Sequence, residues 1–344
     1  MISAYSTSTL TLAGQKRSSG LGQASDSRRG SVLIFVLVML GLLAALLFQM
    51  QATAVSSLRK ASQRVVDVQL QTAQDNALRH ALKVLATDPD LLTDHPSEAW
   101  AQPISLQDPL GYASQVIITD ANRWFDLNNL RFISTENQSR PAEEILHDLF
   151  RLCGDDEPEQ RIRAIVDWVD KDSDGPFEDD YYSDLDPAYS CANDVLTTFP
   201  ELYSVALMER TFFERARSDD PEAPKHPMDT FTVLPSAAVR TSALRVNVNS
   251  APRHVLLGIV GPERSASIEQ FIEFRKEQAI PSIDPYLSSL PEADAAIGRL
   301  YFDVRSTHFE IYIESTAPDG QTLRGKALIE RGNEGEVEVL QWHS

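Results

Sequence analysis

Cysteine is scarce in this chain, which has only two cysteines among its 344 residues. So few cysteines exclude a disulfide-rich scaffold. The signatures of zinc, nucleotide and acyl-transfer sites are also missing: there is no H-E-x-x-H, C-x-x-C, G-x-S-x-G, Walker glycine loop or G-x-G-x-x-G. The sequence therefore predicts a protein that is not an enzyme.

Positive charge is in short supply as well. The chain has 31 Lys and Arg against 50 Asp and Glu, and its formal net charge is −19. The first thirty residues contain four basic residues and one acid, Asp26, so the remainder is more acidic than the whole chain. Because nucleic-acid backbones are bound by cations, this charge predicts no nucleic-acid partner. It suits divalent cations or basic protein partners.

Charge of either sign is absent from Ser31 to Leu58. A bilayer needs about 20 apolar residues in a helix, whereas the apolar part of a secretory signal has about 7–15. At ~1.5 Å per residue this run is roughly 42 Å long, which is enough to cross a membrane. Residues 31–58 are therefore predicted to span a membrane. An A-x-A match at 52–54 leaves signal-peptide cleavage as the alternative.

The same helix is predicted to continue beyond the membrane. There is no Gly or Pro from Leu42 until Pro89, so nothing interrupts a helix that runs from Ser31 to about Leu85. Its second half carries apolar residues at helical spacing, which indicates one buried face. These residues are Leu58, Ala61, Val65, Val68, Ala77, Ala81 and Val84.

The rest of the chain mixes helices and strands. Residues 88–111 are predicted to be loop, and 112–130 one strand followed by a turn. The segments from 141 to about 278 have mostly helical periodicity, and "VNVNSAPRHVLLGIVG" (246–261) resembles a helix-hairpin-helix element. The last segments alternate apolar and polar residues, as antiparallel strands do. A helical block inside an α+β frame indicates an inserted domain.

An acidic stretch, "DWVDKDSDGPFEDDYY", is the strongest polar cluster. Asp170, Asp172, Asp174 and Gly175 match the start of an EF-hand loop. The twelfth position is Tyr181, where an EF-hand has a bidentate Glu, so the loop departs from that template. Two interpretations stay open from spacing alone: a compact Ca²⁺ loop or a solvated acidic loop. The candidate metal ligands are Asp170, Asp172, Asp174, Glu178, Asp179 and Asp180.

The two cysteines, Cys153 and Cys191, lie on either side of this acidic stretch. A disulfide between them is one interpretation, and two small buried thiols is the other. Sequence alone does not give the distance that decides between them.

Four segments in order carry a family resemblance: "RRGSVLIFVLVML", "RWFDLNNL" at 123–130, "IVDWVDKDSDGPFEDDYY" at 165–182 and "VNVNSAPRHVL" at 246–256. Together they resemble the minor pseudopilin K family of type II secretion, also called general secretion pathway protein K. The resemblance implies a pilin-like long N-terminal helix packed on a small antiparallel sheet. It also implies a large inserted all-α domain of SAM-like or helix-hairpin-helix-like type, which is reported to bind calcium in this family.

The same resemblance implies how the chain is processed. A basic pair and a glycine directly before the apolar run resemble a class III leader, which prepilin peptidase cuts between Gly30 and Ser31. The new terminus is then expected to be N-methylated. Other pseudopilins carry a Glu at the fifth mature residue, and this family lacks it; here that position is Phe35.

The predicted division of the chain follows from these features. It comprises a leader (1–30), the transmembrane part of the helix (31–58), the rest of the helix with the first strands (59–130), an inserted helical domain (131–297) and terminal antiparallel strands (298–344). The protein is expected in the cell inner membrane, single-pass, with its C-terminal domain in the periplasm.

The function implied by the resemblance is to initiate or cap the type II secretion pseudopilus, which exports folded periplasmic proteins. The expected partners are minor pseudopilins I and J, the other pseudopilins and prepilin peptidase. The first alternative is a minor pilin of a type IV pilus or competence system. The second is a membrane-anchored periplasmic enzyme that uses the acidic cluster to bind a catalytic metal.

Overall fold

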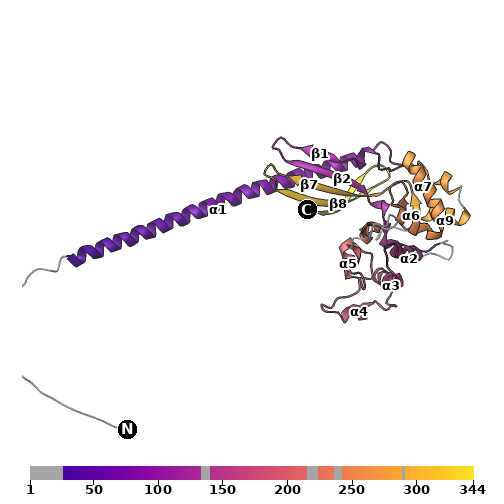
Figure 1. Ribbon diagram of the computed structural model, residues 1–344, viewed down its shortest axis with the longest axis horizontal. Helices are drawn as coiled ribbons and strands as arrows, with labels where there is room; N and C mark the ends of the chain where they lie inside the picture. The colour runs from indigo at the N-terminus through magenta and orange to yellow at the C-terminus, as the bar shows by residue number, and fades with distance from the viewer. Residues whose placement is uncertain (1–25, 133–139, 215–223, 236–241, 289–290) are drawn as a thin grey trace, which may run out of the picture. The chain divides into compact units, whose positions relative to one another are not determined.

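The computed structural model describes residues 26–132, 140–214, 224–235, 242–288 and 291–344 (Figure 1). The chain divides into two compact units, Met1–Val66 and Asp67–Ser344. The sheet and the helical insert both lie within the second unit. The predicted leader falls mostly on residues 1–25, which lie outside the described residues.

A single helix, α1 (Asp26–Ala86), begins the described chain. It runs through the predicted cleavage site at Gly30 and Ser31 and contains the whole charge-free run. Its apolar part has a mean hydropathy of 2.8 and none of it is buried within the structure, so length and composition suit a membrane span. The helix ends at Ala86, three residues before Pro89, because proline disfavours the helical conformation just before it.

A five-stranded antiparallel sheet forms the frame of the second unit, with strand order β1-β2-β7-β8-β9. The strands are β1 (Ile104–Gln107), β2 (Ala113–Asp120), β7 (His308–Thr316), β8 (Thr322–Arg331) and β9 (Val337–His343). The expectation of loop throughout 88–111 was wrong, because β1 lies within it. β1 is a short edge strand, and its half-buried pattern gives little sequence signal.

The C-terminal part of α1 packs on one face of this sheet. Ala77, Ala81 and Leu85 are completely buried and share one core cluster with sheet residues such as Val116 and Ile311. Small alanine side chains let the helix backbone approach the strands closely. The predicted apolar face was correct at Ala77 and Ala81 but wrong at Val68, which is 56% exposed.

The helical insert occupies the connection between β2 and β7. Its boundaries are therefore about 121 and 307, wider than the predicted 131–297. The insert contains two short parallel strand pairs. In them β3 (Phe125–Asp126) pairs with β4 (Phe231–Thr232), and β5 (Val246–Asn247) pairs with β6 (Phe302–Asp303). Its described helices are α2 (Ala142–Leu152), α3 (Pro158–Val169), α4 (Asp179–Ser183), α5 (Arg210–Phe213), α6 (Arg253–Val260), α7 (Ser265–Glu277), α8 (Asp284–Leu287) and α9 (Glu292–Tyr301).

Short 3-10 helices connect these elements. They are η1 (Ala99–Ala101), η2 (Ala121–Arg123), η3 (Leu127–Arg131), η4 (Phe199–Ser204), η5 (Pro227–Thr230) and η7 (Pro262–Arg264). The predicted α+β class, with a long N-terminal helix, a small antiparallel sheet and a helical insert, is confirmed.

Buried asparagines fasten the insert to the frame and connect distant segments within the insert. The Asn247 amide nitrogen lies 3.0 Å from the Asp120 carboxylate at the end of β2 and 2.9 Å from the Ser306 hydroxyl just before β7. Asn128 donates to the carbonyls of Leu196 and Leu234 at 2.9 and 3.1 Å. The polar residues of "RWFDLNNL" and "VNVNS" therefore have a structural use, since they satisfy backbone groups in an otherwise apolar core.

Candidate metal centre

The acidic stretch forms the turn between α3 and α4. Helix α3 ends at Val169, and the N–H of the next residue, Asp170, donates to the Val166 carbonyl at 2.9 Å. The Asp172 side chain then accepts the Asp174 N–H at 2.9 Å, which tightens the turn. The chain closes back on α3 where the Phe177 N–H donates to Asp167 Oδ2 at 2.9 Å. Residues 170–178 thereby form a compact loop against the end of α3.

Gly175 is needed for this closure. A Cβ at this position would lie 2.3–2.6 Å from the Asp167 carboxylate, closer than real side chains approach. The match to the glycine of an EF-hand start thus has a local reason in this fold, which is space beside Asp167.

Three carboxylates converge in the loop. Oxygens of Asp170, Asp172 and Glu178 all lie within 4.8 Å of one another. A Ca²⁺ ion takes oxygen ligands at about 2.3–2.6 Å, so two ligands on opposite sides of the ion are about 5 Å apart. The spacing of these three carboxylates fits one such ion.

Glu178 is the residue that points most clearly to a cation. Its side chain is 7% exposed, and neither carboxylate oxygen has a hydrogen-bond partner in the structure. One buried oxygen of Asp170 is likewise without a hydrogen-bond partner. A buried carboxylate without a partner is costly, and a bound cation removes that cost.

The electrostatics of the loop agree with this geometry. Burial, together with the nearby charges of Asp167 and Asp170, raises the pKa of Glu178 to about 7. Burial also raises the pKa of Asp167 and of Asp170. These carboxyls repel one another in their ionised forms, so a proton or a cation bound in the loop would relieve the repulsion.

The structure divides the six predicted ligands into two groups. Asp170, Asp172 and Glu178 meet, whereas Asp174, Asp179 and Asp180 are exposed and lie outside the cluster. Asp179 has another use, since its Oδ1 accepts the Cys191 N–H at 2.8 Å. Asp179 and Asp180 lie outside the cluster because α4 begins at Asp179, and a helix turns its successive side chains in different directions. Metal binding by any of the six residues stays a prediction.

Asp167 was missed in the sequence analysis. It lies one helical turn before Asp170, on the buried side of α3, and its carboxylate supports the loop from within. The spacing of three residues along a helix was the available signal.

A hollow opens beside the loop, between α2 and α3. Its walls carry acidic side chains from both helices and from the loop, and Ile162 and Val166 provide apolar surface. The lining residues are Glu143, Glu144, His147, Glu159, Ile162, Arg163, Val166, Asp167, Asp170, Asp174, Gly175 and Pro176. Solvent can therefore reach one side of the candidate site.

The two cysteines are both buried and are not joined to each other. The Cys153 sulfur lies 3.4 Å from the Thr230 hydroxyl, and the Cys191 thiol donates to the Asp167 carbonyl at 3.3 Å. The proposed bridge is thus not formed in this structure, because the insert places each sulfur against a different group. Cys191 lies behind the acidic loop, where burial raises the pKa of its thiol.

The helix-hairpin-helix-like segment 246–261 contains β5 and α6, and Gly261, with φ +104°, leads through η7 into α7, the second helix of the hairpin. Its arginines are engaged by acids of the same chain. Arg253 donates to Glu269 at 2.6 Å, and Arg264 donates to Asp294 at 2.6 Å. These ion pairs leave little free positive charge on the hairpin for a phosphate backbone.

The acidic loop lies within a part of the chain that matches a known protein family. Residues 124–218 match the family model for Type II secretion system (T2SS), protein K. The putative type II secretion system protein K of Escherichia coli (strain K12) is 27% identical over 202 residues, which are 56% of this chain and 61% of that protein. The match thus spans less than two thirds of that relative's length.

A solved structure shares the fold. It is the crystal structure of the GspK-GspI-GspJ complex from the enterotoxigenic Escherichia coli type 2 secretion system. A chain of that structure matches with a TM-score of 0.65 and 20% identity, over 83% of this chain and 98% of that chain. The family resemblance drawn from the sequence is confirmed.

Proposed function

Because residues 124–218 match the family model of type II secretion system protein K, we propose that this chain is a minor pseudopilin at the tip of the pseudopilus. In this role α1 anchors the chain in the inner membrane and later packs among the helices of other pseudopilins. The shared fold with a chain of the GspK-GspI-GspJ complex is the observation that carries the proposal.

The helical insert explains why the chain would sit at the tip. It fills the connection between β2 and β7, from about residue 121 to 307, and forms one compact unit with the sheet. A body of this size on the pilin frame would block another subunit from adding above it. Initiation and capping of the fibre are therefore the proposed actions, and no catalytic step is assigned to the chain.

The proposed partners are minor pseudopilins I and J, since the relative with this fold was solved in a complex with GspI and GspJ. Phe35 agrees with a tip position. In other subunits a carboxylate at this place would neutralise the N-terminal ammonium of a neighbour, and an unpaired buried charge is costly. A subunit that starts the fibre has no earlier neighbour to pair with.

The proposed topology has the soluble unit in the periplasm and prepilin peptidase cutting between Gly30 and Ser31. The basic pair Arg28 and Arg29 before the apolar run favours a cytoplasmic N-terminus. Mass spectrometry of the mature protein, from cells with and without the peptidase, tests this. We expect a start at Ser31, N-methylated, only when the peptidase is present. An intact leader, or a cut after Ala54, would contradict it.

We also propose that the loop binds one structural Ca²⁺ through Asp170, Asp172 and Glu178. The ion would neutralise the three carboxylates and hold α3 and α4 together. Calorimetric titration and thermal melting of the intact chain in detergent test this. Glu178→Gln should abolish the rise in Tm with calcium, whereas the exposed Asp180→Asn should keep it. Equal behaviour of the two variants would contradict the assignment.

Deletion of the chain's gene and complementation test the secretion role. Secretion of a type II cargo should stop without the chain and return with it, and tagged chain should co-purify I and J. A variant in which an unrelated membrane helix replaces residues 31–58, while residues 59–344 are kept, serves as the control for folding of the soluble unit. Normal secretion in the deletion strain, or co-purification with type IV pilins instead, would contradict the proposal.

A further inference from the structure

We propose that the flank of α1 from Phe48 to Lys60 binds an anionic phospholipid, with Arg59 and Lys60 on its phosphate group. This inference rests on the proposed membrane anchoring of α1. It assigns a ligand to a part of the chain that neither the secretion role nor the metal centre uses.

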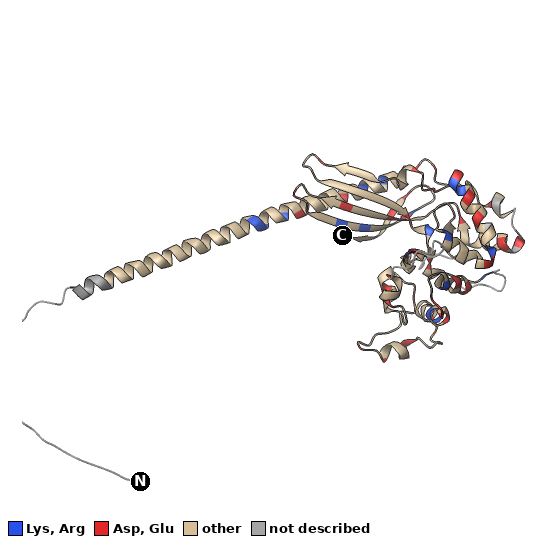
Figure 2. Ribbon diagram, viewed as in Figure 1, with Lys and Arg blue, Asp and Glu red and all other residues tan. Residues whose placement is uncertain are grey.

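The length of the charge-free run determines where Arg59 and Lys60 lie relative to the membrane surface. From Ser31 to Leu58 the helix rises roughly 42 Å at ~1.5 Å per residue. A bilayer is about 40–45 Å thick when its headgroup regions are included. If Ser31 lies at one surface, Arg59 and Lys60 therefore reach the headgroups of the other. Figure 2 shows the uncharged length of α1 and the basic band that follows it.

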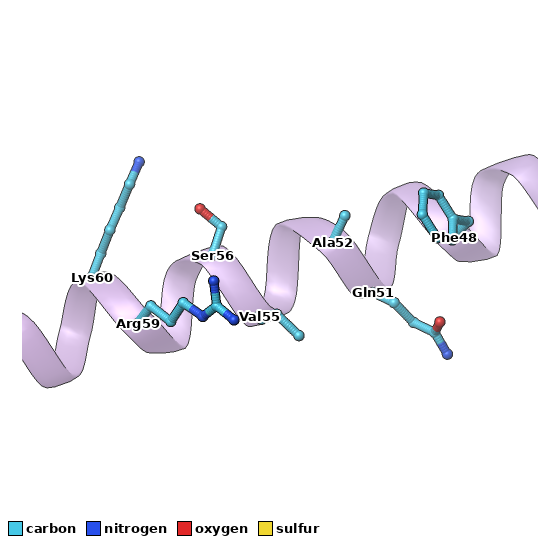
Figure 3. Close-up of a pocket in the computed structure, with 7 residues that line it drawn as sticks. All are labelled: Phe48, Gln51, Ala52, Val55, Ser56, Arg59 and Lys60. Atoms are coloured by element: carbon cyan, nitrogen blue, oxygen red, sulfur yellow. The ribbon is translucent and has the colours of Figure 1, made fainter.

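A shallow hollow runs along the helix directly up to these residues. It is lined by Phe48, Gln51, Ala52, Val55, Ser56, Arg59 and Lys60 (Figure 3). Phe48, Ala52, Val55 and Arg59 recur at helical spacing, so an apolar stripe leads into a guanidinium on one flank. This sequence of groups matches a phospholipid, which has an acyl chain below its phosphate.

The direction of the Arg59 side chain supports the assignment. In Figure 3 its guanidinium lies along the helix toward Val55, and Lys60 extends away from the helix. Side chains of a helix tilt toward its N-terminus, which here is the membrane side. The Arg59 guanidinium therefore lies closer to the membrane than the Arg59 backbone does, at the depth of the lipid phosphates.

Neither residue has an acidic partner within the described chain. The positions three and four residues away from Arg59 and Lys60 hold Val, Ser, Gln and Arg, and no ion pair involves either side chain among the described residues. The first acid along the helix is Asp67. Two unpaired cations at the membrane surface attract anionic headgroups, and each adds to the affinity.

The acidity of the rest of the chain gives this pair a further use. The chain carries a net charge of −19, and an anionic membrane surface repels such a body. Positive side chains between the apolar run and the acidic unit offset this repulsion within about one Debye length of the surface, ~8–10 Å. An acidic face of another subunit could use the same cations, and the experiment separates that occupant from the lipid.

Lipid retention by the full chain tests the proposal. The chain is reconstituted in nanodiscs with equal amounts of phosphatidylglycerol and phosphatidylethanolamine, extracted in mild detergent, and its retained lipids are counted by native mass spectrometry. We expect the wild type to retain roughly fivefold more of the anionic lipid. The Arg59→Gln/Lys60→Gln variant should retain both lipids about equally.

A matched control removes the same charge farther along the same helix. Arg79 and Lys83 are exposed, and Arg79 lies ~30 Å beyond Arg59 at the usual helical rise, outside electrostatic range of the headgroups. Arg79→Gln/Lys83→Gln should therefore keep the lipid preference. Loss of preference in this control, or no preference in the wild type, would overturn the proposal.

Membrane insertion and subunit binding are read separately. All three proteins should resist extraction by alkaline carbonate; extraction of the wild type would instead contradict the membrane anchoring itself. Preserved lipid preference in Arg59→Gln/Lys60→Gln, together with weaker co-purification of partner subunits, would assign the two cations to a protein neighbour and overturn the lipid assignment. Secretion activity in the deletion strain remains an independent readout of the proposed function.

Discussion

Arg331 on β8 and Asp94 form an ion pair in which both side chains are fully buried, with 2.6 Å between Arg331 Nη2 and Asp94 Oδ1. Arg331 also contacts Asp88, at 2.9 Å. The Ser306 N–H donates to the other oxygen of Asp94 at 2.7 Å. The pair therefore joins the segment after α1, the end of the insert and the sheet in one buried polar contact.

Removing the arginine should strongly destabilise the fold. Arg331→Met leaves the Asp94 carboxylate buried without its counter-ion, which typically costs about 3–5 kcal/mol. Chemical denaturation of the detergent-solubilised chain measures this loss. Arg324→Met on the same strand is the control: Arg324 is 79% exposed and pairs with Glu314, so its loss should cost at most ~1 kcal/mol. Similar losses in both variants would show that the buried pair contributes little.

Glu98 should make stability depend on pH. Burial raises its pKa to about 7 from the usual value of 4.5, although its carboxylate accepts a hydrogen bond from the Trp100 indole. A raised pKa means that the folded state holds the proton more tightly than the unfolded state. The contribution to stability is thus complete below pH 4.5 and is lost as pH rises to about 7.

The Glu98→Gln variant tests this dependence, because glutamine keeps an acceptor for Trp100 and carries no charge. At pH 8 the variant should be more stable than the wild type by roughly 1–2 kcal/mol, a value reduced because Glu98 is half-buried. At pH 4.5 the two should agree. Denaturation curves at both values measure the difference, and an equal effect at pH 4.5 would point to packing instead of charge.

Gly175→Ala should disturb the acidic loop without touching a proposed ligand. The added Cβ would lie 2.3–2.6 Å from the Asp167 carboxylate, so the loop must shift. We expect a loss of about 1–3 kcal/mol, as for overpacking in general, and weaker stabilisation by calcium. Thermal melting with and without calcium measures both effects. Pro176→Ala, the next residue, should behave like the wild type; if Gly175→Ala does too, the loop is looser than the structure has it.

Both cysteines should remain thiols in the folded protein. Their sulfurs are buried against different groups, so a thiol reagent should react with neither before denaturation and with both after it. Mass spectrometry of alkylated protein, without prior reduction, counts the thiols. A mass that shows no alkylation after denaturation would mean that Cys153 and Cys191 are bridged in the cell envelope, contrary to this structure.

Local features of the sequence were enough to predict several elements. The charge-free run to Leu58 and the absence of helix breakers up to Pro89 predicted α1, since a helix depends on residues a few positions apart. The alternating pattern near the C-terminus predicted β7, β8 and β9 for the same reason. The order of four short segments also indicated the family whose model residues 124–218 match.

Other features depended on the three-dimensional course of the chain, which residue patterns do not give. Which carboxylates meet was decided by the start of α4 and by Asp167, which lies on the buried side of α3 and closes the loop through a hydrogen bond. The separation of Cys153 from Cys191 follows from their separate partners, Thr230 and Asp167.

By itself the sequence determined a membrane-length helix, a terminal antiparallel sheet and an acidic loop, because periodicity, charge and turn chemistry act over a few residues. Only the tertiary structure decided the edge strand β1, the true limits of the insert and the three carboxylates that converge. The limits of the insert depend on the pairing of β2 with β7 across the chain. The contact of Asp94 with Arg331 is of the same kind, since these residues are 237 positions apart. A sequence read along its length does not contain such distances.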